Sequence, residues 1–367
     1  MKEKRYMENN PYLTKQLITY LGNKRALLGF IGSAVDQICR KLKKDSFTFA
    51  DMFSGSGVVS RYMKPRASFI LSNDLEDYCR TIALCYLASE PLDLREAYAE
   101  LLRDMEMHPV GDGFIRRLYS PKDPENIQPG ERVFYTPENA EYIDTCRSAI
   151  GRAPEHLRPF FLAPLLSEAS IKCNTSGVFK GFYKDRRTGL GAYGGSGRNA
   201  LSRICAPIAL PYPILSGIDR PFEATTMDAN KLAQTMEPVD IAYIDPPYNQ
   251  HPYGSNYFML NLINGYTEPA DISCISGIPK DWNHSVYNKQ SGAAPALADL
   301  CQTIPARFLL VSFNSEGYIS PGEMRDILGQ IGKVEVFDTT YNTFKGSRNL
   351  NYRDIYVNEY LFLVDKG

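Results

Sequence analysis

The chain has 367 residues, which is long enough for two domains or for one large domain with an insert. With 44% hydrophobic and 23% charged residues it has the composition of a globular protein, which excludes a disordered or fibrous chain. The formal net charge of −1 excludes a uniformly basic surface, so a nucleic-acid partner would have to be met by a local basic patch.

Cysteine usage and the start of the chain indicate where the protein works. The eight cysteines are scattered without any C-x-x-C pair, which favours reduced thiols and no bound metal. The charged residues 1–5 are followed by polar residues, and no apolar run is long enough to span a membrane. We therefore expect a cytoplasmic protein with no membrane partner.

The first third of the chain alternates between predicted helices and strands. A helix is predicted over 25–44, a strand over 47–53, a further helix from 58 to 63, and a strand over 67–71. Residues 75–106 are expected to be largely helical. This β-α-β-α succession predicts a parallel sheet.

The composition changes between residues 107 and 222, where Pro, Gly, Arg and aromatic residues become frequent. We interpret this segment as an insert between two halves of a catalytic domain, 1–106 and 223–367. Within it, residues 172–203 carry many basic side chains and a single acid, Asp185, which is typical of phosphate contacts. The alternative is a solvated charged loop. The candidate DNA-binding residues are Lys180, Lys184, Arg186, Arg187 and Arg198, with Asn174 as a reader of base edges.

The strand pattern returns after the insert. Strands are predicted over 224–227, 241–244 and 307–313, and a helix over 321–331. Two further strands are expected near 333–340 and 355–364, and the last should pair antiparallel with its neighbours. A second basic cluster, 345–353, lies in the loop between them and is a further candidate for backbone contacts.

The tetrapeptide Asp245-Pro246-Pro247-Tyr248 directly follows a short apolar run that predicts a buried strand. Two prolines end the strand, so an acid, a rigid carbonyl and an aromatic ring are held together at its carboxyl end. Open α/β sheets bind their ligands at that edge. Such a set suits a flat base with an amino group. The alternative is that these residues only terminate a strand and cap the next helix.

A glycine turn lies between the first predicted strand and the following helix, in the sequence Asp51-Met52-Phe53-Ser54-Gly55-Ser56-Gly57. Glycines let the backbone approach a ligand closely, and a helix N-terminus offers free N–H groups. The third glycine of the dinucleotide fingerprint is missing, which argues against a nicotinamide enzyme. Asp74, at the end of the second strand, is placed either to bind ribose hydroxyls or to cap a helix.

Together these segments resemble the Dam-like DNA adenine methyltransferases that use S-adenosylmethionine. The similarity has three anchors in family order: Tyr20-Leu21-Gly22-Asn23-Lys24, the glycine turn at 51–57, and the tetrapeptide at 245–248. The first anchor departs from the family pattern, because Asn23 stands where a second glycine is usual. Asp74 and Asp228 match the positions that contact the ribose and the adenine of the cofactor, and 312–314 is a weaker match.

The resemblance implies a Rossmann-like methyltransferase sheet with helices on both faces, and an inserted target-recognition domain. It implies an enzyme that moves a methyl group from S-adenosylmethionine to N6 of a flipped-out adenine in double-stranded DNA, alone or beside a restriction endonuclease. The implied catalytic residues are Asp245, Pro246, Pro247 and Tyr248. The implied cofactor residues are Tyr20, Lys24, Asp51, Phe53, Ser54, Gly55, Gly57, Asp74, Asp228 and Asp245. Methylation of cytosine N4 or of RNA, or a non-catalytic nucleic-acid-binding relative, are the alternatives.

Overall fold

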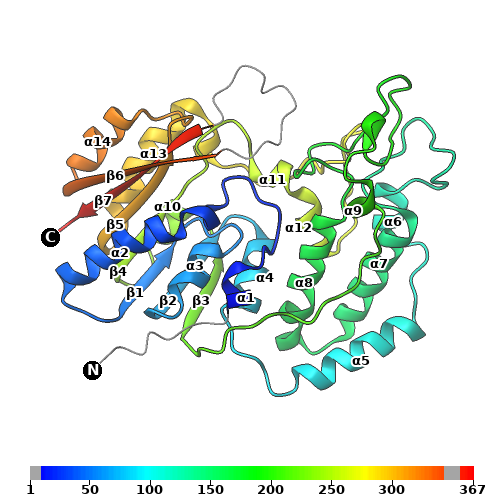
Figure 1. The fold of residues 1–367 in the computed structure, drawn as a ribbon, viewed down its shortest axis with the longest axis horizontal. Helices are drawn as coiled ribbons and strands as arrows, with labels where there is room; N and C mark the ends of the chain where they lie inside the picture. Colours follow the sequence, from blue (N-terminus) through cyan, green and yellow to red (C-terminus); the bar gives the residue numbers. More distant parts are fainter. Residues whose placement is uncertain (1–9, 343–355) are drawn as a thin grey trace.

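The computed structural model describes residues 10–342 and 356–367. Its sheet has seven strands in the order β3-β2-β1-β4-β5-β7-β6 (Figure 1). The first five strands of that order run parallel, and β7 lies antiparallel between β5 and β6. This confirms the predicted sheet and its antiparallel last strand. The strands are β1 (Phe47–Asp51), β2 (Ala67–Asp74), β3 (Phe222–Thr226), β4 (Val239–Ile244), β5 (Ala306–Asn314), β6 (Lys333–Asn342) and β7 (Tyr356–Asp365).

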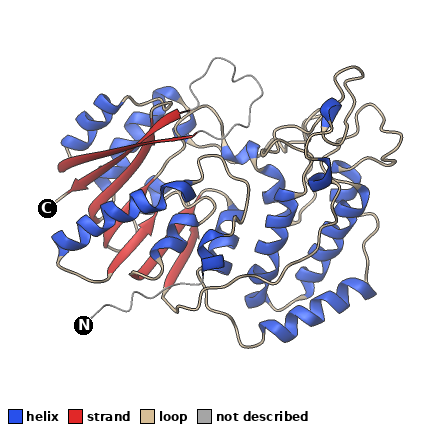
Figure 2. Ribbon diagram, viewed as in Figure 1, coloured by secondary structure: helices blue, strands red, loops and turns tan. Residues whose placement is uncertain are grey.

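Helices cover both faces of the sheet, as predicted (Figure 2). Successive strand residues point to opposite faces, so Phe49 packs beneath one set of helices and Ala50 beneath the other. One face is covered by α2 (Leu28–Leu42) and α3 (Val58–Met63). The other is covered by α10 (Ala229–Ala233), α13 (Gln290–Thr303) and α14 (Pro321–Gly329).

A second apolar core lies in a helical layer beside the sheet, on the right in Figure 1. Helix α4 belongs to both cores, because Ala83 faces the sheet while Ile82 faces the helical layer. Helix α5 packs against α7, although the sequence places it in the catalytic part. The boundaries at 107 and 222 stay predictions. The helices are α4 (Asp77–Tyr86), α5 (Leu94–Met107), α6 (Phe114–Tyr119), α7 (Pro137–Arg152), α8 (Arg158–Ile171) and α12 (Phe258–Gly265).

Local side chains set where the first long helix begins and ends. The helix expected over 25–44 starts as a 3-10 turn, η1 (Lys24–Leu27), because the Asn23 side chain accepts a hydrogen bond from the Arg25 amide. Helix α2 ends at Lys43, which has a left-handed backbone with φ 55°. The short helices are α1 (Asn10–Thr14), α9 (Leu201–Ile204) and α11 (Tyr253–Asn256), with 3-10 turns η2 (Glu155–Leu157), η3 (Gly195–Gly197) and η4 (Val286–Asn288).

The basic cluster at 345–353 lies outside the described residues. Within 10–342 and 356–367, no helix combines the length and the apolar character that crossing a bilayer requires.

Candidate active site

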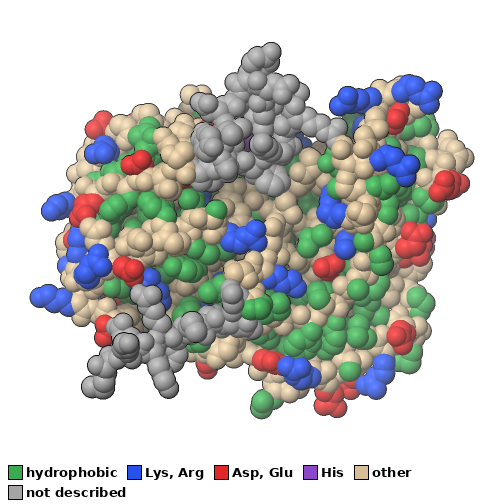
Figure 3. Space-filling view, viewed as in Figure 1, with side chains coloured by type: hydrophobic (Ala, Val, Ile, Leu, Met, Phe, Trp, Pro, Cys, Tyr) green, Lys and Arg blue, Asp and Glu red, His purple; other side chains and the backbone are tan. Residues whose placement is uncertain are grey.

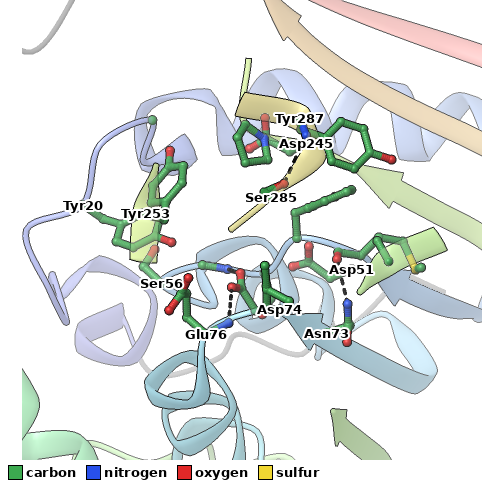
Figure 4. A pocket seen from close by; sticks show the side chains of 18 of the residues that line it. Tyr20, Asp51, Ser56, Asn73, Asp74, Glu76, Asp245, Tyr253, Ser285 and Tyr287 are labelled. Carbon is green, nitrogen blue, oxygen red and sulfur yellow. Dashed lines mark hydrogen bonds between the residues drawn. The ribbon is translucent and has the colours of Figure 1, made fainter. Parts of the chain in front are cut away.

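The predicted site residues converge at the carboxyl ends of β1, β2 and β4. The chain leaves β1 toward β2 on one side, while β4 lies on its other side, so the order of strands reverses between β1 and β4. Ligands bind at such a reversal in open α/β sheets. A cavity that is partly open to solvent lies there, and Figure 4 shows side chains that line it.

The cavity collects nine of the ten predicted cofactor residues: Tyr20, Lys24, Asp51, Phe53, Ser54, Gly55, Asp74, Asp228 and Asp245. The tenth, Gly57, lies at the end of the same turn and begins α3 with φ 70°. Asp228 caps α10, since its Oδ1 accepts hydrogen bonds from the amides of Asn230 and Lys231. The turn after β1 and the loop after β4 thus face one space.

Asp74 shapes the glycine turn. Its Oδ2 accepts a hydrogen bond of 2.8 Å from the Gly55 amide, and its Oδ1 accepts one of 3.0 Å from the Glu76 amide. Gly55 has φ 50°, and a Cβ there would lie 2.7 Å from the Tyr20 ring, so only glycine fits without strain. The capping alternative considered for Asp74 is wrong, because the N-cap of α4 is Glu76 and not Asp74. The Asp74 carboxylate instead holds two loop amides while lining the cavity.

The cavity wall is acidic. Five carboxyl groups and one ammonium, that of Lys24, come from the described residues that line it. Burial raises the pKa of Asp51 and that of Glu76 to about 7. Each of these acids loses hydration that its ionised form needs, and neighbouring carboxylates add repulsion. The cavity therefore favours a ligand that carries positive charge.

Lys24 is buried between two carboxylates. Its Nζ lies 3.0 Å from Asp245 Oδ1 and 3.0 Å from Glu359 Oε1. Burial alone would lower the pKa of Lys24, but the two carboxylates outweigh it and raise that pKa well above its ordinary value. Burial also raises the pKa of Asp245 to about 6; Lys24 opposes this shift, whereas Glu359 adds to it.

An aromatic cluster closes one side of the cavity. The Tyr20 ring stacks on Tyr253 at 4.9 Å and on Tyr257 at 4.8 Å between centroids. The Tyr257 hydroxyl accepts a hydrogen bond of 2.7 Å from the Leu21 amide. These contacts fix the segment that carries Tyr20 and Lys24 over the glycine turn.

The tetrapeptide after β4 lies at the rim of this cavity. Asp245 and Pro247 line it, and Pro246 is buried behind them. Tyr248 is half-buried outside the lining, with its ring edge-on to Phe313 at 6.1 Å between centroids. The Asp245 carboxylate thus faces the cavity, and the Tyr248 ring follows it in the chain outside the lining.

Comparison of the sequence with known proteins shows to which family the chain belongs. The family model of D12 class N6 adenine-specific DNA methyltransferases matches residues 20–190 and 216–327. The chain belongs to this family. It is 31% identical over 354 residues to the Type II methyltransferase M.CviAII of Paramecium bursaria Chlorella virus 1, covering 92% of this chain and 98% of that protein.

Other relatives agree with this assignment. M.NlaIII of Neisseria lactamica, also a Type II methyltransferase, is 28% identical over 358 residues, which cover 95% of this chain and 99% of that protein. Modification methylase StsI of Streptococcus sanguinis is 27% identical over 95% of this chain, which spans 52% of StsI. The expected adenine-specific DNA methyltransferase activity is confirmed, and the cytosine and RNA alternatives gain no support.

The predicted DNA-binding residues of the methyltransferase separate into two groups. Lys180, Lys184, Arg186, Arg187 and Arg198 are all exposed, and Lys and Arg side chains are visible over the loops near α9 (Figure 3). Asp185 organises their loop, since its Oδ1 accepts hydrogen bonds from the Arg187 and Thr188 amides. Lys184 lies over the Phe182 ring at 5.3 Å.

Asn174, in contrast, is fully buried. Its amide nitrogen donates to the carbonyls of Val133 and Ala192, and its oxygen accepts from the Gly194 amide. The side chain therefore braces the basic loop from inside. This corrects the expectation that Asn174 reads base edges, because its hydrogen-bonding atoms are engaged within the protein.

Sequence reasoning missed two acids of the site. Glu76 lines the cavity, where Asn261 and Asn283 donate hydrogen bonds to its Oε2. Glu359 reaches the site from β7. A signal for Glu359 was available, because it shares the buried face of its strand with Val357 and Leu361, where a charge is costly unless it is paired.

Proposed function

We propose that this methyltransferase moves a methyl group from S-adenosylmethionine to the amino group of an adenine held at Asp245-Pro246-Pro247-Tyr248. The observation that carries the proposal is that Asp245 and the glycine turn after β1 line one cavity. A methyl donor bound by the turn and an acceptor amine at Asp245 would then meet at the rim between them.

The cavity fits this donor in charge. S-adenosylmethionine carries a sulfonium and an ammonium, and it supplies an electrophilic methyl group. The carboxyl groups of Asp51 and Glu76 offer matching negative charge, and Asp51 Oδ1 is buried without a hydrogen-bond partner among the described residues. We assign Asp51 and Phe53 to the methionine part, Asp74 and Glu76 to the ribose, and Asp228 to the adenine of the cofactor.

The tetrapeptide activates the acceptor. The lone pair of the adenine amino nitrogen is delocalised into the ring, so the free amine is a weak nucleophile. The Asp245 carboxylate and the Pro246 carbonyl would accept its two hydrogens and localise the lone pair toward the methyl group. This is preorganised electrostatic stabilisation combined with positioning. The Tyr248 ring would stack on the base, which has to leave the duplex to reach it.

The basic loop of the insert would hold the DNA. Its five exposed cations suit phosphate contacts, and its support by Asp185 and Asn174 fixes their spacing. We propose that 107–222 is the target-recognition region. We also propose a cytoplasmic enzyme that works alone or beside a cognate restriction endonuclease, since relatives carry the names Type II methyltransferase and modification methylase.

Methylation mapping tests the reaction and the base together. Expressed in a host without DNA methylation, the wild-type chain should modify one adenine in a short recurring sequence, as read by single-molecule sequencing. The Asp245→Ala chain should modify far fewer of these sites. Modified cytosines, no modified base, or modification undiminished by the substitution would each contradict the proposal.

The salt dependence of DNA binding tests the basic loop. Replacing Arg186 and Arg187 by alanine should weaken binding to duplex DNA and reduce the slope of log K against log salt by about 1 to 2, since each phosphate contact contributes about 0.9. Affinity for S-adenosylmethionine should not change.

The matched control removes the same charge elsewhere, with Arg103 and Arg325 replaced by alanine on the exposed surfaces of α5 and α14. Fluorescence anisotropy at several salt concentrations gives all three slopes. Equal slopes for the wild type and the Arg186/Arg187 variant would remove this loop from the DNA interface.

A further inference from the structure

Glu359 is an acid in the middle of an apolar strand. Its side chain is 1% exposed, and it follows Val357 and precedes Leu361 on the same buried face of β7. Oε1 receives a hydrogen bond of 2.6 Å from Ser312 Oγ on β5 and lies 3.0 Å from Lys24 Nζ. A charge at such a position is strongly unfavourable unless it is paired, and the Lys24 ammonium supplies the opposite charge.

The three charges form a chain of contacts from Glu359 through Lys24 to Asp245. The chain joins the last strand, the N-terminal 3-10 turn η1 and the loop after β4. Because Asp245 and Glu359 share the Lys24 ammonium, the contact of Lys24 with one carboxylate weakens its attraction to the other. Removing Glu359 would leave Lys24 with Asp245 as its one ionised partner among the described residues.

We propose that Glu359 is a positioning residue for methyl transfer: it anchors the Lys24 ammonium so that this contacts Oδ1 of Asp245 and leaves Oδ2 to accept a hydrogen from the target amino group. This rests on the proposed function. Glu359 touches neither the cofactor nor the base in this assignment. It acts through Lys24, by limiting how strongly the ammonium draws on the acceptor carboxylate.

The charge of Glu359 has a second effect, which supplies a readout. Glu359 raises the pKa of Asp245, whereas Lys24 lowers it. Without the Glu359 charge, Asp245 should lose its proton at lower pH. The other titratable groups near Asp245 keep their positions in a Glu359 variant, so their contributions should cancel in the comparison; they are Asp51 on β1, Tyr243 on β4, Tyr248 and Tyr253.

The test compares Glu359→Gln with the wild type in a methyl-transfer assay on cognate duplex DNA with saturating S-adenosylmethionine. We expect kcat to fall about tenfold, because Lys24 then binds Asp245 alone and weakens it as an acceptor. The KM for the cofactor should stay within about threefold. The acid limb of the pH profile should move to lower pH by about half a unit or more.

Two control variants distinguish a positioning role of Glu359 from a general effect on folding. Glu359→Asp keeps the charge, so its acid limb should stay near that of the wild type. Glu335→Gln on the adjacent strand β6 removes a half-exposed ion pair with Lys41 and should behave like the wild type. An acid limb that is unmoved in Glu359→Gln, or that moves equally in Glu359→Asp, would overturn the proposal.

If Glu359→Gln does not fold, Ser312→Ala loosens the same carboxylate more gently. A kcat that is about twofold lower, with an unchanged cofactor KM, would support the proposal, and an unchanged kcat would overturn it. The proposed function fails in a different way, because the wild type itself would then transfer no methyl group.

Discussion

Replacing Asp245 by alanine is expected to lower kcat for adenine methylation by about 10²–10³-fold. Asp245 is the one carboxylate that both lines the cavity and begins the tetrapeptide, so its loss removes the main acceptor for the amino hydrogens. Lys24 would keep Glu359 as a partner at 3.0 Å, and the fold should therefore survive. Single-turnover methylation of a duplex with saturating cofactor measures the effect.

The control lies at the other end of the same strand. Asp240 directly follows Val239 at the start of β4, where it accepts hydrogen bonds from the Thr48 amide and from Lys44, away from the cavity. Asp240→Asn should change kcat by about twofold or less. If Asp245→Ala retained more than about a tenth of the wild-type rate, electrostatic activation of the amine by this carboxylate would be wrong.

Asp51→Asn is expected to stabilise the ligand-free protein at pH 8. The pKa of Asp51 is raised to about 7, chiefly by burial, and Ser60 supplies one hydrogen bond of 2.7 Å. Because the folded-state pKa lies above the unfolded value of about 3.9, the native state binds the extra proton. The stability linked to that proton is fully present below about pH 4 and is lost as the pH rises through 7.

At pH 8 the buried carboxylate is ionised, and asparagine removes this cost, which is on the order of 2–4 kcal/mol. Urea unfolding between pH 4 and pH 8 should therefore show a flatter pH dependence for the variant. The same substitution should weaken binding of S-adenosylmethionine, because it removes a negative charge facing the ligand. A variant that is less stable than the wild type at pH 8 would contradict this account.

A carboxylate of opposite behaviour provides the comparison. The Arg152 guanidinium, through a hydrogen bond, lowers the pKa of the partly exposed Asp104. The stability that the ionised Asp104 contributes is present above its unfolded-state pKa and is lost as the pH falls through its folded-state pKa. Asp104→Asn should therefore cost some stability at pH 7, and this cost should shrink as the pH falls through the folded-state pKa, which is the reverse of Asp51→Asn.

The strands and most of the cofactor site could be predicted from the sequence, because their signals are local. Asp-Pro-Pro or a glycine turn after an apolar run marks where a strand ends in the sequence. Parallel strands bring their carboxyl ends to one edge of the sheet. Asp51, Asp74 and Asp245 therefore meet as expected. Neither the pairing of Lys24 with Glu359 nor the inward direction of Asn174 has a local signal, since each depends on distant partners.

The helices of the inserted segment were missed for a physical reason. Helix α8 is buried on most of its surface and is apolar nearly all round, so it shows no amphipathic period, and it contains Pro164. Helix α7 is also buried along much of its length, including Asp144 and Arg147. Sequence periodicity marks helices at the surface of a core, whereas these two helices form a core themselves.

The placement of Glu359 has a consequence for how the enzyme folds. Lys24 and Glu359 lie far apart in the sequence, and β7 separates β5 from β6 in the finished sheet. Until β7 has joined the sheet during folding, β6 lacks the strand it pairs with and Lys24 lacks one of its two carboxylates. The charge pairing at the catalytic centre is therefore complete only when β7 has taken its place between β5 and β6.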